Sequence, residues 1–488
     1  MNLRAGVPMS LVCKGRIAAL LFCFLICIAC GDVYRPTIIP NPVPTPDPKN
    51  LHAAIALNQN TTFNSGTGMQ VDVSGDSNAG VTKVAMMPVH AAVQAGCAPS
   101  SSCRVWVANS LSDSVSVFSS AGSLGFIGAS TDINLPSGYS PVFVHSTETS
   151  TMYVANVSSP IATAAPGIVV AIGTGNSVVS ASIPVGRNPL AMAETPNGKE
   201  LYVVNQADNN VTHIHTVDKS VATSIPVGAT PSLAYARGDN QRIYVLNQGS
   251  GTITTINTID DTVVGTTAVA AGANFMIYDS HLNRLYVTTS SGSLYVYNAA
   301  VDPGSAPPAA PFLMKQILIP GAGDCAQCVP VSVAALLDGT RVYVASAFET
   351  TDTTKCVQPI GIPAVNCYLT QVTVVDAVNL TLRTSSATAP NPIPVPTVTS
   401  TVLAGVPVYT EANCSSIRFR VSTAAAADSS RVFLATCDAG GIASINTSND
   451  TYVVTLPAPV SAFPPIQTDP NVPAEPPPQN PVFLLTAQ

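Results

Sequence analysis

The sequence predicts an all-β fold built from repeated units of four short strands. An aromatic strand motif recurs along the chain, and its clearest tyrosines, Tyr202, Tyr244 and Tyr286, stand 42 residues apart. Gly, Asn, Asp, Ser and Pro residues divide the rest of the sequence into short apolar runs, as expected for many short strands. Four antiparallel strands in a repeat of this length are typical of one blade of a β-propeller.

The strand motif is a polar or charged residue followed by an apolar, an aromatic and a second apolar residue. A second signal, Gly-x-x-Pro, ends about a dozen residues before three of the aromatics, at Pro141, Pro189 and Pro231. The seven copies of the strand motif cover residues 104–107, 151–154, 200–203, 242–245, 284–287, 341–344 and 431–434. The period 226–269 divides into four β-rich runs at residues 232–236, 243–246, 252–256 and 262–269.

Three copies of the motif continue into an asparagine and carry a resemblance to a known family. Tyr-Val-Ala-Asn at 153–156, Tyr-Val-Val-Asn at 202–205 and Tyr-Val-Leu-Asn at 244–247 resemble the YVTN β-propeller repeat of bacterial and archaeal surface proteins. Other copies depart from this pattern, with Thr289, Ser346 and Thr436 in place of Asn. The resemblance implies a propeller scaffold over nearly all of the mature chain, but it implies no particular activity because such scaffolds have varied roles.

The two ends of the predicted domain are complementary. Residues 55–59 resemble a second strand with no first strand before it, whereas residues 481–484 resemble a first strand with no second strand after it. Their union would give a composite eighth blade, with the C-terminal strand innermost, and would remove open sheet edges. We therefore expect eight blades. The alternative is the family's usual ring of seven, with the terminal strands added to a neighbouring blade.

The N-terminal segment predicts export and lipidation. Arg4, Lys14 and Arg16 precede an apolar run at 17–29 that is too short to span a bilayer but suits a secretory signal. Cys-Ile-Ala-Cys at 27–30 resembles the lipobox of bacterial lipoproteins, although Cys27 stands where Leu is usual. We expect residues 1–29 to be a lipoprotein signal peptide and Cys30 to carry the lipid; the alternative is an ordinary signal peptide in which Cys30 has no role.

The expected mature chain consists of a tether at 30–50 and one propeller domain at 51–488. Six prolines between Pro36 and Pro48 favour an extended polyproline II segment, so the tether would reach roughly 60 Å. Removal of residues 1–29 takes away three positive charges and no acidic residue, which changes the net charge from −7 to −10. We therefore expect a membrane-anchored protein of the cell envelope, at the outer membrane or cell surface, and no nucleic-acid partner.

Eight further cysteines predict disulfides in an exported protein, although a Cys-rich zinc site or a redox pair at Cys325 and Cys328 are alternatives. Short-range pairing is expected because three of the pairs each lie within one loop and the fourth joins a loop to a strand of its own blade. The predicted pairs are Cys97 with Cys103, Cys325 with Cys328, Cys356 with Cys367, and Cys414 with Cys437.

No catalytic residue, cofactor or metal ligand is assigned from the sequence. Among the six histidines, His213 and His215 stand two apart on one strand and so face the same side of its sheet. This spacing is open to metal binding, but no carboxylate or third histidine recurs with them. We therefore expect an exposed polar pair.

The placement of three loop insertions is the best functional indication. The insertions at 320–329, 347–369 and 387–417 are expected at the same end of the strands, and elaborated loops on a rigid scaffold are where binding usually resides. The leading hypothesis is a non-enzymatic binding scaffold for an unidentified protein or glycan. The alternatives are a lactonase-type or other hydrolase acting at the channel mouth, and a structural component of the envelope.

Overall fold

The protein divides into two compact units, Met1–Thr45 and Pro46–Gln488. The computed structural model describes parts of the second unit only, so the predicted signal peptide, Cys30 and the whole predicted tether at 30–50 lie outside the described residues. Among those residues, no helix is long and apolar enough to cross a membrane. The described residues are 53–60, 64–96, 102–121, 127–146, 150–159, 165–299, 310–350, 367–396, 414, 420–437, 440–459 and 479–486.

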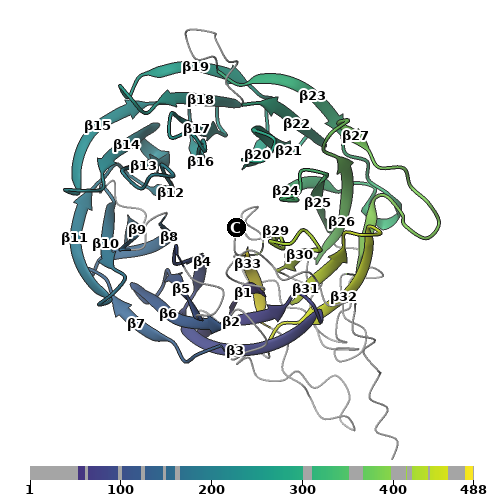
Figure 1. Ribbon diagram of the computed structural model, residues 1–488, viewed down its shortest axis with the longest axis horizontal. Coiled ribbons are helices and arrows are strands. Elements are labelled where there is room, and N and C mark those ends of the chain that lie inside the picture. The colour runs from purple at the N-terminus through teal and green to yellow at the C-terminus, as the bar shows by residue number, and fades with distance from the viewer. Residues whose placement is uncertain are drawn as a thin grey trace, which may run out of the picture. The chain divides into compact units, whose positions relative to one another are not determined.

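The strands of this unit form eight antiparallel sheets arranged as the blades of a β-propeller (Figure 1). Each innermost strand contacts the innermost strands of the two neighbouring blades, and these contacts continue around the complete ring. The prediction of eight blades is therefore confirmed, and the seven-blade alternative is wrong.

Blades 1 to 7 are numbered here in chain order, and their strands are given from the innermost outward. Blades 1 to 4 are β4 (Pro88–Val93), β5 (Ser102–Asn109), β6 (Ser114–Ala121), β7 (Thr131–Asn134); β8 (Tyr139–His145), β9 (Thr151–Ser158), β10 (Ile168–Gly173), β11 (Val178–Pro184); β12 (Pro189–Glu194), β13 (Glu200–Asn205), β14 (Asn210–His215), β15 (Ser220–Pro226); and β16 (Pro231–Ala236), β17 (Arg242–Asn247), β18 (Thr252–Asn257), β19 (Val263–Ala268). Blades 5 to 7 are β20 (Ala273–Asp279), β21 (Arg284–Thr289), β22 (Ser293–Asn298), β23 (Phe312–Leu318); β24 (Val329–Ala335), β25 (Arg341–Thr350), β26 (Cys367–Asp376), β27 (Thr381–Leu382) with β28 (Ile393–Val395); and β29 (Val421–Ala425), β30 (Arg431–Thr436), β31 (Gly441–Asn446), β32 (Thr451–Pro457). Two short 3₁₀ helices are η1 (Gln206–Asp208) and η2 (Gly323–Cys325).

Blade 8 joins the two ends of the domain, as the sequence predicts. Its innermost strand is β33 (Asn480–Thr486), which pairs antiparallel with β1 (Ala53–Gln59). The strands β2 (Ser65–Asp72) and β3 (Ser77–Met86) complete the sheet on its outer side. Every residue of β1 is buried, because a second strand is covered on both faces by the neighbouring blades.

The three residues after the first position of the strand motif are apolar or aromatic because the two faces of the strand pack against different blades. In β13, Leu201 and Val203 pack in a cluster shared with blade 2, whereas Tyr202 and Val204 pack in a cluster shared with blade 4. Alternate residues of a strand point to opposite faces of its sheet. The recurring motif therefore supplies both halves of the core between successive blades.

An arginine at the start of the second strand links its blade to the next one at four joints. Arg431 forms an ion pair of 2.9 Å with Asp76, which lies in the hairpin between β2 and β3 and so connects blade 7 to the composite blade 8. At the other three joints the guanidinium donates to a backbone carbonyl of the corresponding hairpin. These pairs are Arg104 with Thr174, Arg284 with Ala377, and Arg341 with Thr447.

Blade 6 departs from the regular pattern at two of the insertions that were predicted from the sequence. The strands β25 and β26 extend into the segment 347–369, and β28 lies inside the segment 387–417 and pairs with β26. The fourth strand is therefore split into β27 and β28. Between them the side chain of Asn391 takes the place of backbone, since its amide accepts from the Val374 N–H at 2.8 Å and donates to the Val374 carbonyl at 2.9 Å.

Candidate functional site

The antiparallel strands define two ends of the ring, which differ in their connections. Turns between first and second strands and between third and fourth strands lie at one end, here called the hairpin face. Connections between second and third strands, and those between blades, lie at the other end, here called the loop face. The three predicted insertions belong to the loop face.

Two disulfides brace the loop face. Cys325 and Cys328 are bonded within the connection from blade 5 to blade 6, with their Cα atoms 5.0 Å apart. Cys414, in the connection from blade 6 to blade 7, is bonded to Cys437 at the end of β30. All four cysteines are buried, and both bonds coincide with predicted pairs.

The other two predicted pairs are only partly within the described chain. Cys103 is buried in the core beside blade 8, but its predicted partner Cys97 lies outside the described residues. Cys367 begins β26, and its predicted partner Cys356 also lies outside them. The pairing of these four cysteines stays a prediction.

In the described part of the chain, the innermost strands bring two histidines and two carboxylates to the central channel or its ends: His90, His145, Glu194 and Asp279. His90 stacks on Phe143, with 3.9 Å between the ring centroids. Burial lowers the pKa of His145 to about 4, so this imidazole is neutral at physiological pH. Asp279 accepts the backbone N–H groups of the following turn, which is a structural role.

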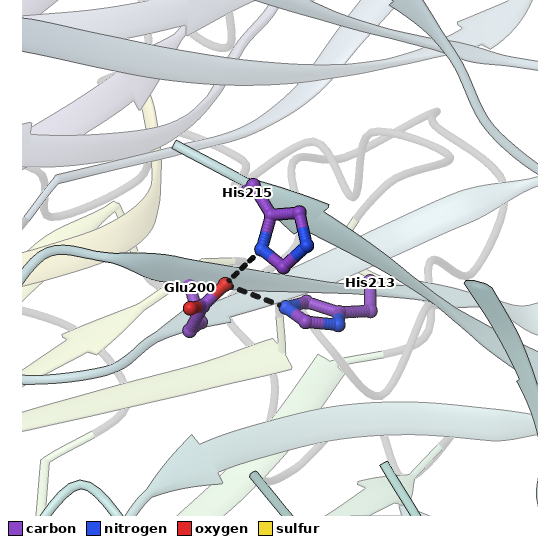
Figure 2. Close-up of side chains that lie close together, drawn as sticks. All are labelled: Glu200, His213 and His215. Atoms are coloured by element: carbon purple, nitrogen blue, oxygen red, sulfur yellow. Dashed lines mark hydrogen bonds and ion pairs between the residues drawn. The ribbon is translucent and has the colours of Figure 1, made fainter. Parts of the chain in front are cut away.

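A polar cluster of Glu200, His213 and His215 lies instead on blade 3, at its hairpin face. Figure 2 shows the three side chains. Glu200 opens β13 and His215 closes β14, and the two residues are direct partners in the antiparallel register. One carboxylate oxygen of Glu200, Oε2, lies 2.8 Å from His213 Nε2 and 2.7 Å from His215 Nδ1. Among the described residues, this is the one group of three His, Cys, Asp or Glu side chains placed to share a metal ion.

The cluster is anchored to blade 4 through Asp261, in the hairpin between β18 and β19. His213 Nδ1 lies 2.7 Å from Asp261 Oδ2, and the Tyr202 hydroxyl donates to Asp261 Oδ1 at 3.0 Å. The rings of Tyr202 and His213 stack, with 4.5 Å between centroids and 4° between planes. Asp261 therefore holds both the imidazole and the phenol of the adjoining blade.

The electrostatic environment keeps these hydrogen bonds in place. Burial, with Asp261 next in importance, raises the pKa of Tyr202 well above its ordinary value, so the phenol remains a donor. The hydrogen bond that the Glu200 carboxylate accepts from His215 raises the pKa of His215, which is exposed to solvent. Glu200 therefore stabilises the protonated, positively charged form of the His215 imidazole.

The structure corrects the expectation of an exposed polar pair without a carboxylate. His213 is only 2 % exposed, and both Glu200 and Asp261 contact it. The prediction was wrong for His213, which is covered at the joint with blade 4, whereas His215 is exposed as expected. The signal available in the sequence was Glu200, which occupies the motif position where five other blades have arginine.

These features define an eight-bladed β-propeller with a disulfide-braced loop face and a histidine–carboxylate cluster on the opposite face. The sequence matches no family model and no curated protein. Its fold is similar to three solved structures: a Kuenenia stuttgartiensis hydrazine synthase (15% identity, 65% of this chain and 86% of that chain, TM-score 0.43), a protein of unknown function from Desulfotomaculum acetoxidans (12%, 68% and 94%, 0.47), and the Dos1 propeller (10%, 57% and 72%, 0.44).

Proposed function

We propose that this protein is a lipid-anchored β-propeller of the cell envelope that acts as a non-enzymatic interaction scaffold. Its binding surface would be the loop face, and its ligand a protein or a glycan. The observation that carries the proposal is the bracing of the connections on either side of blade 6 by Cys325–Cys328 and Cys414–Cys437. Loops held on a rigid ring can present a fixed surface at a low entropic cost of binding.

The channel offers less support for a hydrolase. His145 is held neutral by burial, and His90 accepts a backbone N–H from Val144 at its Nδ1. The described histidine–carboxylate cluster that could share a metal lies on the second and third strands of blade 3, away from the innermost strands. These arrangements favour a scaffold over general acid–base chemistry at the channel mouth.

Residue-specific photo-crosslinking tests the proposed binding surface. A photoreactive amino acid at Gln327, an exposed residue of the loop face, should give a discrete adduct of higher mass in intact cells. The matched control is Val378, which is 64% exposed at the hairpin face of blade 6 and should give no adduct. Equal labelling at both positions, or the absence of an adduct from Gln327, would contradict the proposal.

The anchor is tested separately, by intact mass of the membrane-extracted protein. The mature N-terminus should be Cys30, and its mass should include more than one attached acyl chain. A single acyl chain gives only marginal membrane affinity, so stable anchoring needs at least two. Cys30→Ser should release the protein from the membrane fraction. A mature N-terminus at another residue, without acyl mass, would overturn this part of the proposal.

A further inference from the structure

The hairpin-face cluster has the donor set and the geometry of a metal site. Its ligand atoms are His213 Nε2, His215 Nδ1 and a carboxylate oxygen of Glu200, all within 4.8 Å of one another (Figure 2). Ligands at about 2.0–2.2 Å from a tetrahedral ion stand about 3.3 Å apart. The observed separations of 2.7 and 2.8 Å need to widen by only about half an ångström. Two imidazoles and one carboxylate suit zinc and its neighbours in the first transition row.

A second, independent observation concerns the nitrogen of His213 that faces away from the proposed ion. In metal sites the second nitrogen of a coordinating imidazole usually donates to a carboxylate, which fixes the ring and its tautomer. His213 has this partner, since its Nδ1 lies 2.7 Å from Asp261 and Asp261 is in turn held by the Tyr202 hydroxyl. Stacking on Tyr202 fixes the plane of the ring. The buried ligand is therefore oriented by contacts that do not involve the other two ligands.

The exposure of the three side chains allows an ion to enter. The His213 side chain is 3% exposed, whereas those of Glu200 and His215 are 27% and 48% exposed. The open side faces solvent at the hairpin face, so a fourth position remains for water or an external ligand. Three protein ligands with an open position are typical of a zinc site that can take a further ligand.

The charge at this joint also fits a cation. Elsewhere in the ring, an arginine in the motif position of Glu200 links the second strand to the next blade. Here the motif position and the facing hairpin bring two carboxylates, Glu200 and Asp261, to the same imidazole. A divalent ion on Nε2 of His213 would supply the positive charge that arginine supplies at four other joints.

We propose that Glu200, His213 and His215 bind a divalent transition-metal ion, zinc being the best fit, with Asp261 orienting His213. In the absence of metal the same distances are hydrogen bonds between the imidazole nitrogens and the two carboxyl groups. With a metal ion bound, Nε2 would hold the ion and Nδ1 would donate to Asp261. The proposal is independent of the scaffold function of the loop face.

The test is calorimetric titration of the chelator-treated, full-length protein with Zn²⁺, with Mg²⁺ as a hard-ion comparison. We expect about one Zn²⁺ per chain and no comparable binding of Mg²⁺. His215→Ala, at an exposed position, should weaken Zn²⁺ binding at least 100-fold, and Asp261→Asn should weaken it about 10- to 100-fold. His281→Ala, an exposed histidine outside the cluster, is the matched control and should bind as the unmodified protein does.

Two results would overturn the metal site. One is the absence of stoichiometric Zn²⁺ binding to the unmodified protein, which would leave the cluster as a hydrogen-bonded link between blades 3 and 4. The other is an equal loss of binding in His281→Ala and His215→Ala, which would indicate nonspecific binding of Zn²⁺ to surface histidines. A melting temperature that rises with Zn²⁺ in the unmodified protein and the control, but not in His215→Ala, would support it.

Discussion

Deletion of residues 480–488 should leave the propeller unable to reach a stable folded state. The deletion removes β33, whose Val482 and Leu484 are buried, and exposes the paired edge of β1. Burial of each such side chain contributes about 1.5–3 kcal/mol, and the lost strand pairing adds to this. Since whole domains are stable by only about 5–15 kcal/mol, the loss approaches the total. Far-ultraviolet circular dichroism and thermal melting of the truncated and full-length proteins measure the loss of stability.

Supplying the missing strand separately gives the control for this deletion. A synthetic peptide covering residues 479–488 should restore a cooperative melting transition to the truncated protein, because it can pair with β1. A scrambled peptide of the same composition should not. If the truncated protein melts at the temperature of the full chain without any peptide, β33 does not close the ring.

Replacement of Asp450 by Ala should cause the second-largest loss of stability. Asp450 lies in the hairpin of blade 7, with its side chain only 3% exposed, and forms ion pairs of 2.9 Å with Arg341 and Arg383 of blade 6. The Tyr343 hydroxyl also donates to it. Removal of one partner from a buried ion pair costs about 3–5 kcal/mol, because the remaining charge is left uncompensated. Urea unfolding should show a loss of this size.

Two variants separate charge from backbone effects at this position. Asp450 has a φ of 55°, a left-handed conformation that Asn tolerates well, so Asp450→Asn removes the charge and keeps the backbone geometry. It should cost less than Asp450→Ala because one acceptor oxygen remains. Asp218→Ala, at an exposed hairpin position, should cost much less stability than Asp450→Ala. Similar losses for Asp218→Ala and Asp450→Ala would contradict the predicted role of the buried carboxylate.

The repeat and the closure of the ring were predictable because each depends on short sequence patterns that can be recognised without knowledge of the packing. The aromatic motif identifies the second strand of each of blades 1 to 7. The incomplete sets of strands at the two ends of the domain indicate how those ends combine. The split fourth strand of blade 6 was not predictable, since the Asn391 side chain there takes over hydrogen bonds that backbone usually makes. No periodicity in the sequence indicates that a side chain replaces backbone in this way.

The histidine cluster was missed for a different reason. Its carboxylates come from two places that sequence spacing does not connect: Glu200 through the register of β13 with β14, and Asp261 from the hairpin of the next blade. The histidine spacing alone showed that the two rings share a face. Which neighbour covers that face follows only from the packing of one blade on the next.

The composite blade also sets the order in which the chain can fold. Thr67 of β2 donates a hydrogen bond to the side chain of Gln479, 412 residues later in the chain, just before β33 begins. The strands β1 to β3 are therefore made early but complete their sheet last, and an entropically costly closure must wait until β33 has been synthesised. Until then a nascent chain exposes an unpaired strand edge to proteases and folding factors. A chain interrupted late in synthesis thus remains distinguishable from a finished one.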